Sequence, residues 1–445
     1  MLSSVILLFV IGGLIVFANK RPIYGLMYYF GIRMLIPYTA RVFSFSFNTM
    51  AFICVLIFML SSLRYTYRAS SVIDKRYIHL VKFLFLSIFC LSILGTVVPY
   101  SFQWSGIFQL FVTEFLPSLM LAMYLKNKKD YITFCKWIAI FGTLFSIYAI
   151  YTYFYSSNPI FDFFNTSSRI SLDLDEYSTG RMGLSGIAVG IYDDKIACSL
   201  ICMLFCMFVF CTDCIVKYLR MVAFSSSFIA LYLTTQRTGL LCLLLFCVAY
   251  YLNKVRYSKN KLIFFIVVGV AVLFVFSGNK FIDDLFSGIF SVFTDNSQSK
   301  NAVGGSNIEM RIAQLSNCID YLNITSLLQG AGYGFAGYYY KYIWNIELYG
   351  NDARFLGFES YLFQTLMNSG IIGVFCWGRF FRELFSLVRN DKTNCCRLFG
   401  IFYVIAILMT DASASLYIFF FIFVMIYKYS SVYVTCENNQ KQSNL

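Results

Sequence analysis

Apolar runs long enough to cross a membrane recur along almost the whole chain, and they leave little choice of fold class. A helix needs about 20 apolar residues to cross a hydrocarbon core of about 30 Å. The chain is 59% hydrophobic and only 13% charged, whereas soluble domains average roughly 25% charged residues. We therefore predict an all-α polytopic membrane protein in which residues 1–428 form a single bundle.

Thirteen segments are predicted to span the membrane. The first is interpreted as a retained helix, because no small-residue cleavage site follows it. The second contains Arg33 and Pro37, and the irregularity expected there leaves twelve or thirteen crossings. The predicted segments are 4–19, 22–40, 47–63, 79–98, 105–125, 132–154, 191–212, 217–234, 238–253, 262–277, 358–378, 398–410 and 412–428.

Short basic connections set the predicted orientation. Lys and Arg residues follow the third, fifth, ninth and eleventh segments, and these connections share one side if every segment crosses once. By the positive-inside rule that side is the cytoplasm. Two long loops, about 155–190 and 278–357, then face outward, which in a bacterium is the periplasm, and residues 429–445 form a short cytoplasmic tail. The net charge of +13 is attributed to this asymmetry, so no nucleic-acid partner is expected.

The longer outer loop contains a predicted amphipathic helix. Ile312, Leu315, Ile319 and Leu322 recur at helical spacing and share one face. Such a face predicts a helix that lies on the bundle or at the membrane interface.

A glycine-rich turn follows this helix. The glycines from Gly330 to Gly337 are expected to exclude regular structure and to permit a tight backbone turn. The stretch from Gly332 also fits the dinucleotide pattern GxGxxG, but no strand precedes it and no βαβ unit surrounds it. We therefore predict a bend that lets the backbone approach the bundle.

Outward-facing arginines are the strongest candidates for holding an anionic ligand, because Arg pairs bidentately with phosphate and stays charged. Arg237 lies in a minimal turn between two apolar helices, where a charge is costly and usually functional. Arg311 begins the amphipathic helix of the longer loop. Arg181 and Arg354 are supporting candidates, whereas Arg169 is better explained by loop solubility.

The segment that re-enters the membrane after the longer loop begins at Glu359. A carboxylate at a helix N-terminus is favoured by the helix dipole alone. Its functional interpretation is a general base that removes a proton from an attacking sugar hydroxyl. A run rich in aromatic residues, from Tyr333 to Tyr349, precedes this segment. About half of these residues are expected to form an interfacial belt, and others to stack on the faces of sugars. The candidates for contact with a glycan are Tyr333, Tyr338 and Tyr340.

The remaining reactive side chains favour neither a metal nor a cofactor. The fifteen Cys lie mainly in apolar segments, so no disulfide framework is expected, and helix packing is preferred to a zinc site for the group from Cys198 to Cys214. The only His, His79, lies at the cytoplasmic start of the fourth segment, so no Ser-His-Asp set can form outside. Glu114 and Asp411 are the main carboxylates within apolar segments, fewer than a proton-coupled transporter would need.

Three local patterns and their order resemble the O-antigen polymerase and ligase superfamily. They are Gln236-Arg237-Thr238-Gly239, Arg311 followed about twenty residues later by Gly330-Ala-Gly-Tyr-Gly, and Glu359-Ser-Tyr-Leu-Phe-Gln-Thr-Leu-Met-Asn-Ser-Gly370-Ile-Ile-Gly373. The resemblance implies metal-independent, inverting glycosyl transfer at the outer face of the bacterial inner membrane, with undecaprenyl pyrophosphate as the leaving group. Ligases of this superfamily carry a His where Glu359 stands, which favours the polymerase branch.

The resulting expectation is a multi-pass polymerase of O-antigen repeat units with its site facing the periplasm. Its expected partners are an undecaprenyl-pyrophosphate-linked oligosaccharide, membrane lipid and, as a further candidate, a chain-length regulator protein. Arg237 and Arg311 would hold pyrophosphate, and Arg311 would act with Glu359 in catalysis. A flippase or exporter of lipid-linked oligosaccharides and an O-antigen ligase remain as alternatives. A polymerase for capsule or exopolysaccharide would have the same features.

Overall fold

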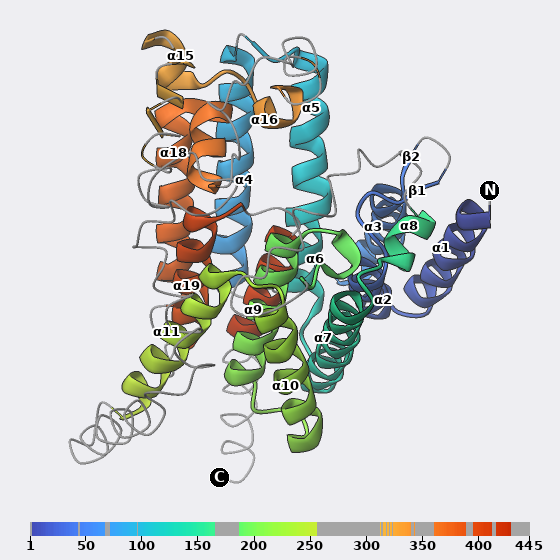
Figure 1. The fold of residues 1–445 in the computed structure, drawn as a ribbon. Helices are drawn as coiled ribbons and strands as arrows, with labels where there is room; N and C mark the ends of the chain where they lie inside the picture. The colour runs from blue at the N-terminus through green and yellow to red at the C-terminus, as the bar shows by residue number, and fades with distance from the viewer. Residues whose placement is uncertain are drawn as a thin grey trace, which may run out of the picture.

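The structure is a computed structural model of the 445-residue chain. Figure 1 shows a helical bundle in which α15 and α16 lie at the same end as the start of α5. Nothing is described for residues 262–277, where one span was predicted, or for most of the two long loops. The described residues are 2–42, 45–66, 72–95, 97–164, 187–255, 312, 315–316, 318–319, 321–322, 324–339, 342, 360–388, 395–411 and 415–428.

The apolar segments that the structure describes fold into helices, which confirms the all-α polytopic prediction. Four described helices are long and apolar enough to cross a membrane, and five shorter apolar helices accompany them. The α-helices are α1 (Leu2–Lys20), α2 (Pro22–Leu35), α3 (Phe47–Thr66), α4 (Val72–Leu94), α5 (Tyr100–Gln109), α6 (Leu116–Tyr124), α7 (Lys128–Tyr155), α8 (Pro159–Phe164), α9 (Lys195–Cys211), α10 (Lys217–Leu233), α11 (Arg237–Val255), α15 (Ile324–Gln329), α16 (Phe335–Tyr338), α18 (Tyr361–Leu387) and α19 (Cys395–Met409).

Three short departures from α-helix were not predicted as such. The second predicted segment ends early, because Ile36 is extended ahead of Pro37 and a two-residue antiparallel pair follows, β1 (Arg41–Val42) with β2 (Phe45–Ser46). A π-helical turn, η1 (Leu110–Phe115), joins α5 to α6. A 3-10 turn, η3 (Gly190–Tyr192), precedes α9.

The helix Leu416–Lys428 lies at the centre of the bundle, and most of its side chains are fully buried. An apolar surface on every side is typical of a helix enclosed by other helices. Phe419 stacks on Tyr403 of α19 with ring centroids 4.0 Å apart. At the far end the Lys428 ammonium donates to the Asp74 carboxylate of α4 at 2.7 Å. This pair neutralises two charges that burial would otherwise disfavour.

One cysteine pair corrects the expectation that no disulfide forms. Cys211 ends α9 and Cys395 begins α19, and the structure joins them in a disulfide with Cα atoms 5.9 Å apart. The two residues are separated by 184 positions in sequence. Composition could not reveal the pairing, since it depends on how α9 and α19 pack.

The predicted face of the amphipathic segment is only partly right. Cys318 and Leu322 are buried in a second apolar cluster, with Leu315 packed against it. Ile312 and Ile319 are exposed on the described surface. The buried face is therefore rotated away from the predicted one, and it packs against α18 and the glycine-rich turn.

The glycine-rich turn inserts into a break in α18, which confirms the predicted close approach of its backbone to the bundle. α18 loses helical geometry at Gly370, where φ is +63°. The Ala331 N–H donates to the Met367 carbonyl at 2.7 Å, and the Ala331 carbonyl accepts from the Val97 N–H at 3.0 Å. The exclusion of regular structure was too broad, since α16 forms one helical turn within the glycine-rich stretch.

Two glycines are required where the turn touches the break. Gly330 has φ +81°, and a Cβ on it would lie 2.5 Å from the Ser369 nitrogen. A Cβ on Gly370 would collide with the Leu328 carbonyl group. Both obstacles are backbone atoms, which cannot move aside as a flexible side chain can.

We predict that Gly330→Ala and Gly370→Ala each destabilise the protein by roughly 1–3 kcal/mol or more, since a left-handed backbone is strained for Ala even before the collision is counted. The yield and thermal midpoint of detergent-purified protein measure the effect. Gly378→Ala in α18 is the matched control, because a Cβ added at Gly378 would have nothing within 4 Å. Equal behaviour of all three variants would contradict the packing described above.

Candidate functional site

A polar cavity of about 360 Å³ extends beneath the glycine-rich turn toward the middle of the bundle. Its walls come from α5, η1, the turn itself, α18 and the segment after α19. Five amide or carboxylate side chains line it: Gln109, Glu114, Gln364, Asn368 and Asp411. The hydroxyl groups of Thr113, Thr365 and Ser369 add to this polar lining.

Glu114 lines this cavity from the π-helical turn η1. Its Oε1 accepts hydrogen bonds from Arg33 Nη2 at 3.3 Å and from Thr113 Oγ1 at 3.1 Å. Its Oε2 is buried and makes no hydrogen bond within the described part of the chain. One carboxylate oxygen is thus held by the protein, while the other retains unused accepting capacity.

Arg33 is buried beside Glu114, with its side chain 6% exposed. Its guanidinium lies over the ring of Tyr417, 4.6 Å from the centroid. The Tyr192 hydroxyl donates to the Arg33 carbonyl. A carboxylate, an aromatic face and a fixed backbone therefore hold Arg33 in one position.

Two side-chain amides hold the turn over the cavity. Gln103 is fully buried. Its Oε1 accepts from the Tyr333 N–H at 3.0 Å and its Nε2 donates to the Val98 carbonyl at 2.7 Å. Asn368 Oδ1 accepts from the Phe335 N–H at 3.0 Å, just before the break in α18. These bonds replace the regular backbone pairing that a glycine-rich turn lacks.

The start of α18 is attached to the end of α19 beside the cavity. The Ser360 hydroxyl donates to the Leu408 carbonyl at 2.8 Å, and the Tyr361 N–H donates to the Thr410 carbonyl at 3.0 Å. Tyr361 also lines the cavity. The segment that follows Glu359 is therefore placed at the cavity edge by these contacts.

The tyrosines predicted to contact a glycan are separated by the fold. Tyr333 lines the cavity. Tyr338 packs against Phe102 and Tyr342, with ring centroids 5.7 Å and 5.0 Å away, and it does not line the cavity wall. The other predicted site residues of the long loops lie outside the described residues: Arg181, Arg311, Tyr340, Arg354 and Glu359.

Arg237 is the one predicted pyrophosphate-binding residue that the structure describes. It is half-buried at the first position of α11, after a turn in which Thr235 has φ +56°. Gly239 lets α11 approach Ser199 of α9 closely, since a Cβ there would collide with the Ser199 hydroxyl. Arg237 does not line the polar cavity.

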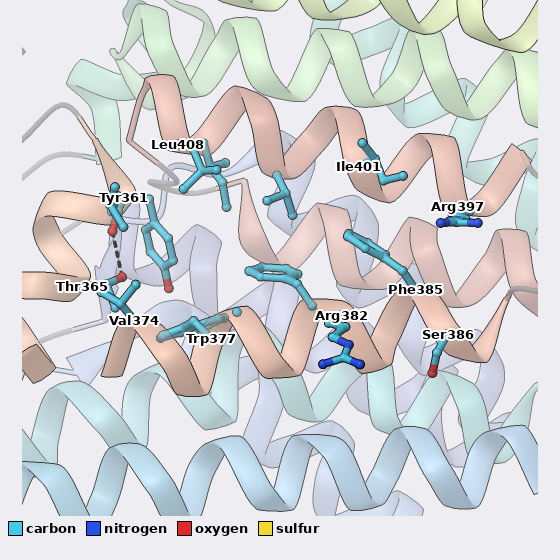
Figure 2. Close-up of a pocket in the computed structure, with 15 residues that line it drawn as sticks. Tyr361, Thr365, Val374, Trp377, Arg382, Phe385, Ser386, Arg397, Ile401 and Leu408 are labelled. Carbon is cyan, nitrogen blue, oxygen red and sulfur yellow. Dashed lines mark hydrogen bonds between the residues drawn. The ribbon is translucent and has the colours of Figure 1, made fainter. Parts of the chain in front are cut away.

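A second cavity of about 620 Å³ runs between α18 and α19. Figure 2 shows its mostly apolar lining, with Tyr361 at one end and Arg382 and Arg397 toward the other. Tyr361 and Trp377 line both this cavity and the polar one. The two cavities are thus adjacent, with very different linings.

The sequence does not reveal the Arg33–Glu114 ion pair, although it draws attention to each of the two charges separately. The sequence identifies Arg33 as a source of irregularity and Glu114 as one of few carboxylates in apolar segments. The two residues are 81 positions apart, so no spacing rule links them. The available signal was one charge of each sign in two different apolar segments, because such charges are usually paired.

Residues 222–378 match a family described as O-antigen ligase. The match covers about a third of the chain and includes Arg237, the glycine-rich turn and the first part of α18. Over these residues the chain is similar to the O-antigen ligase family, which supports the resemblance to the O-antigen ligase and polymerase superfamily. A search of curated proteins finds no match.

The family match supports a coarse functional statement. Members are membrane enzymes that transfer glycosyl groups, and their function is of the O-antigen ligase or polymerase type. Together with the apolar helices, the match indicates a multi-pass membrane protein of lipopolysaccharide biosynthesis. The family match does not separate the two branches.

We predict that Gln103→Leu releases the turn, because it removes one donor and one acceptor from a fully buried site and leaves their partners unsatisfied, at about 1–3 kcal/mol per group. Limited proteolysis at the turn and the thermal midpoint measure the effect. Ser105→Leu, an exposed position two residues further along α5, is the control. Identical proteolysis of the two variants would show that Gln103 does not hold the turn.

Proposed function

We propose that the protein is a polysaccharide repeat-unit polymerase that acts at the outer face of the bacterial inner membrane. It joins a growing glycan, released from undecaprenyl pyrophosphate, to a newly delivered lipid-linked repeat unit. A hydroxyl oxygen of the acceptor forms a bond to the anomeric carbon of the donor, and the bond from that carbon to pyrophosphate breaks. The hydroxyl proton passes to a carboxylate, for which Glu359 is the candidate.

The position of the only His supports the polymerase branch over the ligase branch. His79 lies near the start of α4, whereas Gly95, beyond the other end of α4, touches the glycine-rich turn. The resemblance to ligases implies a His at the start of the segment that re-enters the membrane after the longer loop. This chain has Glu359 at that position. A ligase mechanism based on that His is therefore closed to this chain.

The arginines carry the electrostatic part of the proposal. Pyrophosphate develops negative charge as it leaves, and fixed guanidinium groups stabilise that charge in a site of low dielectric constant. Arg237 and Arg311 hold the pyrophosphate, with Arg181 and Arg354 in support. The family match and the inclusion of Arg237 and Arg311 in the matched region support these roles.

We predict that Arg237→Ala and Arg311→Ala each abolish long glycan ladders at normal protein levels, because each variant loses a bidentate phosphate contact. Gel electrophoresis of cell-surface glycan measures the ladder, and immunoblotting measures the protein. Arg237→Lys should restore less than full length, since Lys cannot form the bidentate pair. Arg220→Ala is the control, because Arg220 pairs with the exposed Asp213 near the junction of α9 and α10. Full ladders in both Ala variants would refute the assigned roles.

The family description makes O-antigen ligase the second candidate function. Deletion of the gene separates the two. Loss of a polymerase leaves a single repeat unit on the final acceptor, while loss of a ligase or a flippase leaves none. We predict the single unit, and a bare acceptor would overturn the proposal.

A further inference from the structure

The polar cavity beneath the turn has two features that the protein's own packing leaves unexplained. It is bordered by a carboxylate in the middle of an apolar bundle, and that carboxylate has an unused oxygen. An ionisable residue at membrane depth is a functional candidate by default. A π-helical turn inside a longer helix is also frequent at functional sites, and η1 places Glu114 at the cavity wall.

The lining matches the chemistry of a sugar. Carboxylates accept hydrogen bonds from hydroxyls, and side-chain amides both donate to hydroxyls and accept from them. Tyr333, Tyr361 and Trp377 add aromatic surface to the wall, and such side chains offer an apolar face with a polar tip. A small number of placed polar groups beside aromatic walls is the usual composition of a small-ligand pocket.

We propose that this cavity is a sugar-binding subsite, in which Glu114 Oε2 accepts a hydrogen bond from a hydroxyl of the lipid-linked repeat unit. The inference rests on the proposed function for the identity of that unit. Arg33 and Thr113 hold Oε1, which fixes the direction of Oε2. Glu114 is thus a substrate-binding residue, and Arg33 is a positioning residue that acts through it.

The start of α18 lines the cavity, and this is the end of the helix that follows the predicted outer loop. Tyr361 begins α18 at that end, and Ser360 connects it directly to Glu359. Tyr333 lines the cavity from the glycine-rich turn. A sugar in the cavity would therefore lie next to the segment that carries the proposed general base. The adjacent apolar cavity between α18 and α19 borders the same Tyr361.

The ion pair allows a test that separates binding from folding. Removal of Glu114 alone strands a buried Arg33, which is strongly destabilising, whereas replacement of a whole buried pair by apolar residues is often neutral. Arg33→Met combined with Glu114→Leu should therefore restore the protein level that Glu114→Leu alone lowers. If the pair is only structural, the double variant will also restore function.

Lipid binding to the purified protein is then measured by native mass spectrometry with two probes. One is the undecaprenyl-pyrophosphate-linked repeat unit extracted from cells that lack this gene, and the other is undecaprenyl pyrophosphate without sugar. We expect the native protein to prefer the sugar-bearing lipid by about tenfold, as for one charge-assisted hydrogen bond. The double variant should bind the two lipids equally.

Two further variants complete the comparison. Glu114→Asp keeps the charge but withdraws Oε2 by one methylene, so it should show a reduced preference even if the double variant fails to fold. Asp74→Leu combined with Lys428→Met removes a second buried ion pair, remote from the cavity, and should keep the full preference.

The outcomes distinguish this inference from the proposed function. A native-like preference for the sugar-bearing lipid in both the double variant and Glu114→Asp would overturn the subsite. Equal binding of both lipids by the native protein would also overturn the subsite, and it would leave the polymerase proposal unaffected. A preference that depends on Glu114, in a protein whose deletion leaves glycan ladders unchanged, would refute the polymerase and keep the subsite.

Discussion

The contact between Gly330 and Gly370 is the constraint on which the arrangement of the site depends. Each glycine has a left-handed backbone and presses against backbone of the other segment, so neither position has room for a side chain. The break at Gly370 interrupts the hydrogen bonding of α18, and the Met367 carbonyl accepts from Ala331 of the turn. In an apolar bundle an unsatisfied carbonyl is expensive, so the turn and the broken helix stabilise each other.

The contact between the glycine-rich turn and the break in α18 determines which side chains face the cavity. Gln103 and Asn368 fix the turn above it, and Tyr333 forms part of its wall. On the opposite side η1 directs Glu114 inward, against Arg33 from α2. Segments distant in sequence thus meet around one polar volume, and each depends on packing that the others provide.

The predictable part of the fold is local in origin. The length and composition of apolar segments predicted the helices, because a chain in lipid must satisfy its backbone internally. The spacing of glycines predicted the turn. The break in α18 was missed because glycines are common inside apolar segments. Only the contact with Gly330 distinguishes Gly370 from its neighbours, and that contact is not visible in the sequence. The Cys211–Cys395 and Arg33–Glu114 pairs were missed because helix packing alone brings their members together.

Stability does not account for the Arg33–Glu114 pair. Transfer of two charges out of water costs several kcal/mol per ion even after relaxation, and an apolar pair of similar volume is commonly no less stable. The Lys428–Asp74 pair shows how such a cost is offset when both partners are close, since its N···O distance is 2.7 Å. The Arg33–Glu114 contact is longer, at 3.3 Å, and leaves one carboxylate oxygen unused at a cavity wall. A carboxylate with one oxygen held and the other buried without a partner in the described part of the chain, beside a cavity, is better suited to a ligand hydroxyl than to packing.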